Sequence, residues 1–167
     1  CLYVSIATDT GGFRYSNTTS LTHQIVSDLI NNGVNVAEVS QKIFESTSFE
    51  KVKLMGQAAN ALELLENGRV ASIAITDDVA KKLGVKDEDY DGVINLGRNI
   101  NSVEVAVMFR QKENEVKVNL RSKSYVDVAA IANLFSGGGH KRAAGCTVKG
   151  SIEEVKKKVL EDIKNSL

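Results

Sequence analysis

The sequence predicts an α/β protein in two parts. We expect a C-terminal α/β domain with a mixed sheet flanked by helices, preceded by the last strand and helices of a parallel-sheet α/β domain. The apolar, β-branched run at residues 2–8 is typical of a strand buried on both faces. Two later runs, at residues 103–109 and 116–120, alternate apolar and polar side chains on either side of Lys112-Glu113-Asn114. That alternation indicates a hairpin, and helical spacing between the strands completes the α/β pattern.

The division of the chain follows from its first fifty residues. The first residue is Cys1 rather than methionine, and residues 1–50 supply one strand and helices only. We therefore expect residues 1–50 to be the C-terminal remnant of one domain of a longer protein. Residues 51–167 contain enough strands and helices for a complete second domain. A helix over residues 48–66, stopped by Asn67-Gly68, is expected to connect the two.

Caps and turn residues separate the other elements. In the first part, the turn Asp9-Thr10-Gly11-Gly12 follows the strand, and helices are expected at residues 21–31 and 36–46. In the second part, serine and aspartate residues stand where helices should begin, and glycines where they should end. The expected strands lie at residues 70–76, 103–109, 116–120 and 146–148, and the expected helices at 78–83, 90–98, 128–134 and 152–163.

Composition excludes several classes of protein. The chain has 167 residues with 21 basic and 21 acidic side chains, so bulk charge does not make it a general polyanion binder. Any contact with nucleic acid must come from a local patch. Cys1 and Cys146 form no disulfide framework, which favours a reducing compartment and a cytoplasmic location. No apolar run approaches the roughly 20 residues of a membrane helix, so no membrane partner is expected.

The run from Gly137 to Gly145 is the most restrictive feature of the sequence. Three consecutive glycines let backbone amides approach a ligand closely, and His140 and Arg142 add a titratable donor and positive charge. The alternative is a loose loop at the end of the preceding helix, which requires only one glycine. We expect a phosphate cradle, with these candidate binding residues: Gly137, Gly138, Gly139, His140 and Arg142.

Arg121 and Ser122 end the predicted strand at residues 116–120. The polar residues of that strand, among them Lys117 and Asn119, point away from its apolar side, and Arg121 continues the polar side. A guanidinium at this place can bind a phosphate through two hydrogen bonds. The alternative is a solvated sheet edge. We include Arg121 and Ser122 among the candidate substrate-binding residues.

Asp9 is the candidate metal ligand. It follows the predicted strand at residues 2–8, and ligands of open α/β sheets bind at the carboxyl ends of strands. A carboxylate suits Mn²⁺ or Mg²⁺. The alternative is an aspartate that caps the following turn. One carboxylate does not make a metal site, and His23, on a predicted helix, is a poor partner for it.

Two strings together resemble the DHH phosphoesterases over the whole chain. The segment from Thr8 to Thr19 is similar to their fourth motif, and Leu120-Arg121-Ser122 with Gly137–Gly145 resembles the signature of their DHH-associated C-terminal domain. Order and approximate spacing both agree. The branch that the chain resembles most is the oligoribonuclease and pAp-phosphatase group, often called nanoRNases.

The resemblance implies two domains with a substrate cleft between them. In this family the N-terminal domain holds two Mn²⁺ ions through aspartates and histidines, of which Asp9 would be the one present here; Mg²⁺ is the alternative metal. The C-terminal domain binds the terminal nucleotide, a role that falls on Arg121, the glycine amides and His140. The implied substrates are short RNA oligonucleotides and the mononucleotide bisphosphate pAp.

The sequence departs from the family in one respect: it contains no Asp-His-His triplet. Two-metal hydrolysis needs two ions roughly 3.5–4 Å apart, which one aspartate cannot hold. We therefore expect this chain alone to bind substrate without catalysis and to be metal-free. Two alternatives within the resemblance are hydrolysis of cyclic dinucleotides and a non-catalytic nucleic-acid-binding module like the C-terminal domain of alanyl-tRNA synthetase. A homodimer through an exposed sheet edge is also expected.

Overall fold

The computed structural model describes residues 2–167 and divides into two compact units, Cys1–Thr47 and Ser48–Leu167. Cys1, one of the two cysteines considered above, lies outside the described residues. The identification of residues 1–50 as a catalytic-domain remnant and of 51–167 as a substrate-binding domain stays a prediction. Within residues 2–167, no helix combines the length and apolarity needed to traverse a bilayer.

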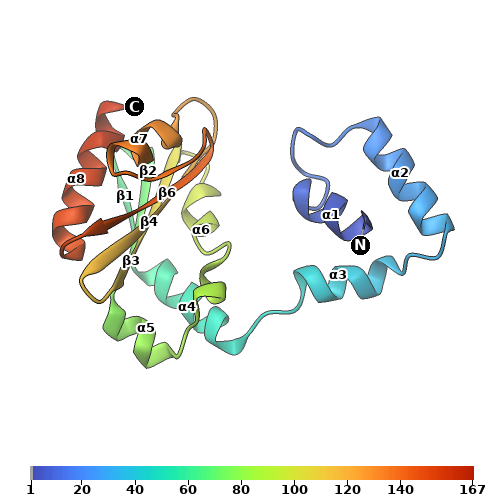
Figure 1. Cartoon of the computed structure of the whole chain (residues 1–167), viewed down its shortest axis with the longest axis horizontal. Helices are drawn as coiled ribbons and strands as arrows, with labels where there is room; N and C mark the ends of the chain where they lie inside the picture. Colours follow the sequence, from blue (N-terminus) through green and yellow to red (C-terminus); the bar gives the residue numbers. More distant parts are fainter. Residues whose placement is uncertain (1) are drawn as a thin grey trace. The chain divides into compact units, whose positions relative to one another are not determined.

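The first unit is helical. Its helices are α1 (Leu2–Asp9), α2 (Ser20–Asn31) and α3 (Val36–Phe44), and residues 2–47 contain no strand (Figure 1). Its small core centres on Tyr3, Ala7 and Val26. The predicted buried strand at residues 2–8, and with it the last strand of a parallel sheet, is therefore wrong.

The physical reason for the helix α1 lies in spacing and in backbone hydrogen bonding. Tyr3 and Ala7 are four residues apart and buried, whereas Leu2 and Val4 are 57% and 37% exposed. This pattern suits one face of a helix, and a short apolar run does not distinguish a strand from a buried helix by itself. A helix also satisfies its backbone groups locally, whereas a strand in this unit would have no neighbour to pair with.

The second unit is built on a six-stranded mixed sheet with strand order β1-β2-β3-β4-β6-β5. The β2–β3 pair is parallel and the other four pairs are antiparallel. The expected hairpin is present as β3 and β4. The strands are β1 (Leu62–Leu65), β2 (Val70–Ile75), β3 (Val105–Lys112), β4 (Glu115–Ser122), β5 (Gly138–His140) and β6 (Ala143–Lys149).

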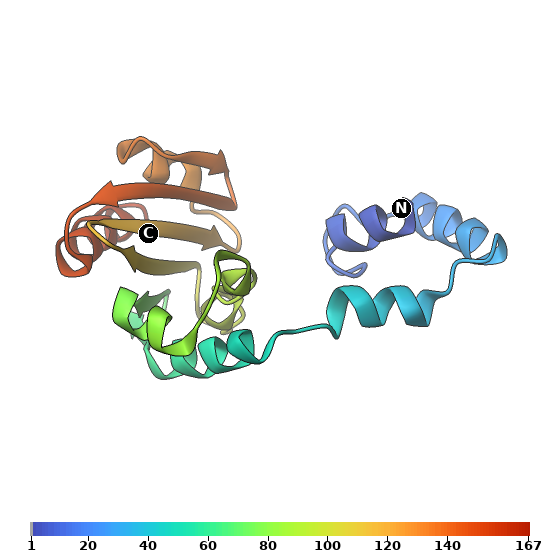
Figure 2. The same ribbon diagram turned by 60° about the horizontal axis from the view of Figure 1, so that its bottom comes forward.

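Helices cover one face of this sheet fully and the other face in part. On the fully covered face, α7 (Val128–Leu134) and α8 (Ile152–Asn165) pack over a core that includes Phe109 and Leu120 (Figure 1). On the opposite face, α4 (Phe49–Asn60), α5 (Asp77–Leu83) and α6 (Asn95–Arg98) pack mainly against β2 and β3. In Figure 2, β4 and β6 lie above α4 and α5, outside the half that these helices cover. The β4–β6–β5 half is therefore open on one face.

Strand β4 confirms the predicted two-sided pattern. Its residues alternate between buried positions, such as Leu120, and half-buried positions, such as Asn119. Lys117, Asn119 and Arg121 lie on the open face, as expected. Cys146 of β6 is a free, buried thiol, and burial raises its pKa, which disfavours the reactive thiolate.

Three other predicted elements differ from the structure. The helix expected over residues 48–66 ends at Asn60 and is followed by β1. The helix expected over residues 90–98 is a 3₁₀ turn, η1 (Asp87–Tyr90), and then the single turn α6, with Gly92 between them at a φ of 82°. A glycine with positive φ interrupts helical geometry, which explains this break. No strand was predicted at the glycine run, where Gly138–His140 form the edge strand β5.

Candidate functional site

The register of the three outer strands brings the candidate binding residues together. Arg121 of β4 lies opposite Ala143 of β6, and Ala143 lies opposite His140 of β5. Directly paired residues of antiparallel strands share one face of the sheet, so Arg121 and His140 flank a small alanine. Two strand spacings, about 9.6 Å, separate the backbones of Arg121 and His140. Sequence reasoning placed Arg121 and His140 on either side of the glycine amides. In the structure the residue between them is Ala143, and Gly138 and Gly139 precede His140 on β5.

The next row along the same strands lacks side chains at two of its three positions. Asn119 lies opposite Gly145, and Gly145 lies opposite Gly138. A Cβ at Gly145 would stand 2.9 Å from the carbonyl oxygen of Val118, so glycine is needed there for strand packing. The result is a bare backbone floor between the polar side chains of β4 and the edge strand. A hollow of about 430 Å³ lies over this floor, lined by Lys117, Asn119, Gly137 and Gly145 among others.

The three consecutive glycines have different surroundings. A Cβ at Gly137 would stand 2.3 Å from the carbonyl oxygen of Gly145, and one at Gly139 would stand 2.5 Å from that of Ala143. Gly139 also has a φ of 143°. These two glycines are required by the close approach of β5 to β6. Gly138 is different, because the only atom near its Cβ position is the Asn133 Oδ1 at 4.0 Å. The fold therefore leaves open space beside Gly138.

Ser122 and Arg142 make contacts within the protein. Ser122 is fully buried, and its hydroxyl donates to the carbonyl oxygen of Val126 at 2.7 Å. The Arg142 Nη1 donates to the same carbonyl at 2.8 Å. Together they tie β4, the start of α7 and the β5–β6 turn to one another. Their predicted role in direct substrate contact is untested, and the observed bonds give them a positioning role.

Glu104 is a buried carboxylate that was not among the predicted site residues, and it holds the backbone next to them. Glu104 is 6% exposed and accepts hydrogen bonds from the backbone amides of Ser124, Tyr125 and Val126, with distances between 2.8 and 3.1 Å. The Ser124 hydroxyl donates to it at 2.7 Å. Burial raises the pKa of Glu104, but these hydrogen bonds outweigh burial and hold the pKa below its ordinary value. An acidic residue at the start of an otherwise apolar strand was the available signal.

Glu104 and Asp127 orient the helix that leads into the glycine run. Glu104 holds the segment that ends at Val126, and the Asp127 carboxylate accepts from the amides of Ala129 and Ala130 at the start of α7. Helix α7 ends beside Ser136, whose φ is 56°, and Gly137 follows. The backbone is thus fixed from Arg121 to β5.

Asp9 belongs to the first unit and ends α1, rather than following a strand as predicted. Its side chain is exposed, and its carbonyl oxygen accepts from the Asn17 side chain at 3.1 Å. The following residues form a tight turn in which Gly11 and Gly12 have φ values of 58° and 68°. Thr10 is buried there, and its hydroxyl donates to the Ile6 carbonyl oxygen at 2.7 Å.

The described residues do not form a complete metal site. Within residues 2–167, no three His, Cys, Asp or Glu side chains gather so that they could hold an ion. Asp9 can supply one carboxylate ligand, and a two-metal centre needs several more. We therefore assign no catalytic step to a metal held by this chain.

Comparison with known families agrees with this architecture. The model of the DHHA1 domain matches residues 67–167, more than half of the chain. The chain belongs to the DHHA1 family. This confirms the family resemblance found in the sequence, and the DHHA1 match contains every candidate residue except Asp9.

Curated relatives extend the similarity to the first unit. The chain is 33% identical over 164 residues to the bifunctional oligoribonuclease and PAP phosphatase NrnA of Thermus thermophilus, covering 97% of this chain and 48% of that protein. It is 31% identical over 147 residues to the protein of the same name from Bacillus subtilis, covering 88% of this chain and 46% of that one. The chain thus spans about half the length of the curated relatives it matches.

A solved structure supports the α/β architecture of the DHHA1 chain. An exopolyphosphatase-related protein from Bacteroides fragilis superposes with a TM-score of 0.91 at 28% identity, covering 99% of this chain and 50% of that one. Both the helical first unit and the mixed sheet of the second unit therefore have counterparts in that structure.

Proposed function

We propose that this chain is the substrate-binding part of a metal-dependent phosphoesterase that hydrolyses short oligoribonucleotides, pAp, or both. The family and the names of its relatives support the substrate class. We further propose that the row from Arg121 to His140, together with the backbone of β5, binds the phosphate of a terminal nucleotide.

The observation that carries the proposal is the space at Gly138. Packing against β6 accounts for Gly137 and Gly139 but not for Gly138. A phosphate oxygen close to the backbone amides would account for the glycine at position 138, because a side chain there would block the approach of the phosphate. Arg121 and His140 lie in the neighbouring row of the same sheet face, on either side of Ala143, and can add charge-assisted hydrogen bonds. In this role Ser122 and Arg142 position the site from within.

The chemistry assigned to this chain is recognition. Arg121 and His140 bind and orient the phosphate, and the bare floor at Gly145 leaves room for the nucleotide. We propose that the metal of the intact enzyme is Mn²⁺, with Mg²⁺ as the alternative, and that two ions are held mainly by residues other than those described. A cytoplasmic location and a homodimer stay predictions. Cyclic-dinucleotide hydrolysis and non-catalytic nucleic-acid binding remain alternatives that no structural observation favours.

Calorimetry with pAp tests the binding proposal. Arg121→Ala or His140→Ala should each remove one charge-assisted contact, so pAp binding should weaken by about 10- to 150-fold. Lys157→Ala, an exposed change on α8, is the matched control and should leave affinity unchanged. If neither Arg121→Ala nor His140→Ala weakens binding, the assignment of this site is wrong.

A phosphatase assay tests the division of labour. The chain alone, supplied with Mn²⁺ and pAp, should release no phosphate above a protein-free blank, because it offers Asp9 as its one proposed metal ligand. Turnover well above the blank would show that the chain carries a complete catalytic centre, and the proposal that it only binds substrate would be abandoned.

A further inference from the structure

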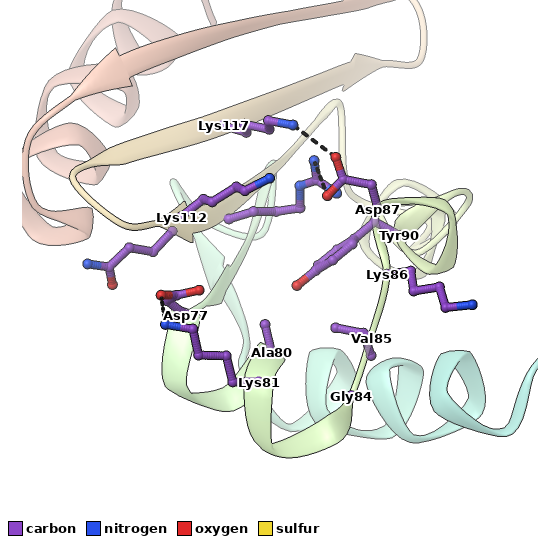
Figure 3. A pocket seen from close by; sticks show the side chains of 12 residues that line it. Asp77, Ala80, Lys81, Gly84, Val85, Lys86, Asp87, Tyr90, Lys112 and Lys117 are labelled. Atoms are coloured by element: carbon purple, nitrogen blue, oxygen red, sulfur yellow. Dashed lines mark hydrogen bonds and ion pairs between the residues drawn. The ribbon is translucent and has the colours of Figure 1, made fainter.

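A second hollow lies on the same domain, between α5, η1 and the β3–β4 hairpin (Figure 3). It has a volume of about 320 Å³, and we call it the Tyr90 pocket. Positive charge predominates in its lining, although the whole chain is neutral. Its charged residues are Lys81, Lys86, Arg110, Lys112 and Lys117, opposed by Asp77 and Asp87.

Asp87 lies beside two of these positive groups, Lys117 and Arg110. Its carboxylate accepts from the Lys117 Nζ at 3.1 Å and lies 4.0 Å from the Arg110 Nη2 (Figure 3). The hydrogen bond from Lys117, followed by the charges of Lys117 and Arg110, holds the pKa of Asp87 below its ordinary value. The Asp87 side chain is 65% exposed, so this bridge costs little to break.

Arg110 is held in place without full hydrogen bonding. Its guanidinium stacks 4.2 Å from the ring centroid of Tyr90, and its side chain is 13% exposed. The 4.0 Å separation from Asp87 is too long for a hydrogen bond. Its buried Nε has no hydrogen-bond partner among the residues the structure describes. A rigid, incompletely bonded guanidinium beside a lysine is suited to a phosphate, which brings more acceptor oxygens and more charge than one carboxylate.

We propose that the Tyr90 pocket is a second phosphate site, and that Asp87 is a built-in competitor which leaves Lys117 and Arg110 when the ligand's phosphate binds them. The ligand is a nucleotide chain with at least two phosphates, one of which lies at the glycine run. This inference rests on the function proposed above for the first site.

The two sites share residues. Arg110 and Lys117 line both the hollow beside the glycine run and the Tyr90 pocket. They come from adjacent strands, β3 and β4, whereas the glycine run forms the edge strand β5. Three strand spacings, about 14 Å, separate β5 from β3, so one phosphate group cannot contact both ends. A mononucleotide with one phosphate should therefore bind at the glycine run, and an oligonucleotide should bind at both sites.

Calorimetry with three probes tests the proposal: adenosine monophosphate, the 5′-phosphorylated diadenosine dinucleotide, and inorganic phosphate. Asp87→Asn removes the competing carboxylate and should tighten dinucleotide binding by about two- to fivefold, as expected from loss of an exposed ion pair. It should leave the affinity for the monophosphate unchanged. Glu88→Gln changes the net charge equally, lies outside the pocket lining, and should alter neither affinity.

A second pair of variants removes a positive charge instead of a negative one. Lys112 extends over the hollow from the hairpin (Figure 3), and Lys112→Ala should weaken dinucleotide binding by about two- to fivefold. Lys157→Ala removes an exposed lysine from α8 and should leave dinucleotide binding unchanged. Equal behaviour of Asp87→Asn and Glu88→Gln, or of Lys112→Ala and Lys157→Ala, would overturn the proposal.

Two further outcomes identify the source of the phosphate and separate this inference from the first. If Asp87→Asn tightens binding of inorganic phosphate while the dinucleotide gains nothing, the pocket takes a free anion and the oligonucleotide proposal is wrong. Failure of the first site would instead appear as unchanged pAp affinity in Arg121→Ala. The change that Asp87→Asn causes in the ratio of dinucleotide to monophosphate affinity reports on the Tyr90 pocket.

Discussion

At the scale of single residues, Gly137, Gly138 and Gly139 are adjacent but have different reasons to be glycine. Backbone atoms of β6 stand within 2.5 Å of the Cβ positions of Gly137 and Gly139, whereas Gly138 faces open space. The argument that a loop would need only one glycine was incomplete, because the edge strand itself requires two. Of the three glycines, only Gly138 lacks a packing reason to be glycine, so the argument for ligand binding rests on Gly138.

This difference predicts opposite results for two similar substitutions. Gly137→Ala should destabilise the fold by about 1–3 kcal/mol, since its methyl group collides with the Gly145 carbonyl oxygen. Gly138→Ala should change stability by less than about 0.5 kcal/mol but weaken pAp binding by about tenfold. Urea unfolding and calorimetry on both variants check this. Normal pAp affinity in Gly138→Ala would contradict the close approach of a ligand.

Glu104 provides a prediction about pH. Its pKa lies below the ordinary glutamate value of about 4.3, so its stabilising hydrogen bonds are complete above that value. The stabilisation is lost as the pH falls through the lowered pKa of the folded state. Glu104→Gln should cost about 1–3 kcal/mol at pH 7, because buried amides lose a charged acceptor. The difference from the parent should shrink in strong acid.

Urea unfolding at pH 7 and at pH 3 measures this difference. Glu153→Gln, a change of an exposed carboxylate on α8, is the control and should have little effect at either pH. A penalty for Glu104→Gln that stays constant between the two pH values would show that shape, rather than charge, makes Glu104 important.

At the scale of elements, Ser48 joins α4 to η1, the turn that forms one wall of the Tyr90 pocket. Its hydroxyl accepts from the Lys51 amide at 3.1 Å and donates to the Asp89 Oδ1 at 2.5 Å. Asp89 is buried and also accepts from the Lys86 amide at 2.8 Å. The hydrogen bond from Ser48, and to a smaller degree the bond from the Lys86 amide, lower the pKa of Asp89.

Ser48→Ala should lower the free energy of unfolding by about 1–2 kcal/mol, because it removes a helix cap and a partner of a buried carboxylate. A double-mutant cycle with Asp89→Asn checks the contact. We expect a coupling of about 0.5 kcal/mol or more, and strictly additive effects would mean that α4 and η1 are not joined through this bond.

Elements with a periodic pattern were predicted well from the sequence. The β3–β4 hairpin and helices α7 and α8 lie where alternation or helical spacing placed them. The misassigned elements are short, such as α1 and β5, or depend on partners distant in the sequence, as β1 does on β2. Local patterns carry little information about such pairings. Glycines have no side chain to show a strand period, which explains why no strand was predicted at β5.

At the scale of the whole molecule, a neutral chain concentrates positive charge on the open half of one sheet. The positive side chains come from β4, in this open half, and from the adjacent strand β3, next to a floor of small residues on β6. Sequence reasoning named Arg121, His140 and the glycines as candidates from the chemistry of these residues, and the family resemblance pointed to the same residues. It missed Arg110, Lys117 and Glu104, because only the sheet order brings these residues beside the motif. The order β4-β6-β5, which inserts β6 between the arginine and the glycine run, depends on pairing between strands distant in the sequence.

The central claim is that the glycine run and Arg121 bind a nucleotide phosphate on this DHHA1 domain. The most direct measurement is a titration of the ¹⁵N-labelled chain with pAp, followed by amide chemical shifts. The account predicts that the largest shifts occur at Gly138, Gly139 and His140, accompanied by Asn119 and Arg121. Largest shifts confined to other parts of the chain, with the amides of Gly138–His140 unmoved at saturation, would contradict it.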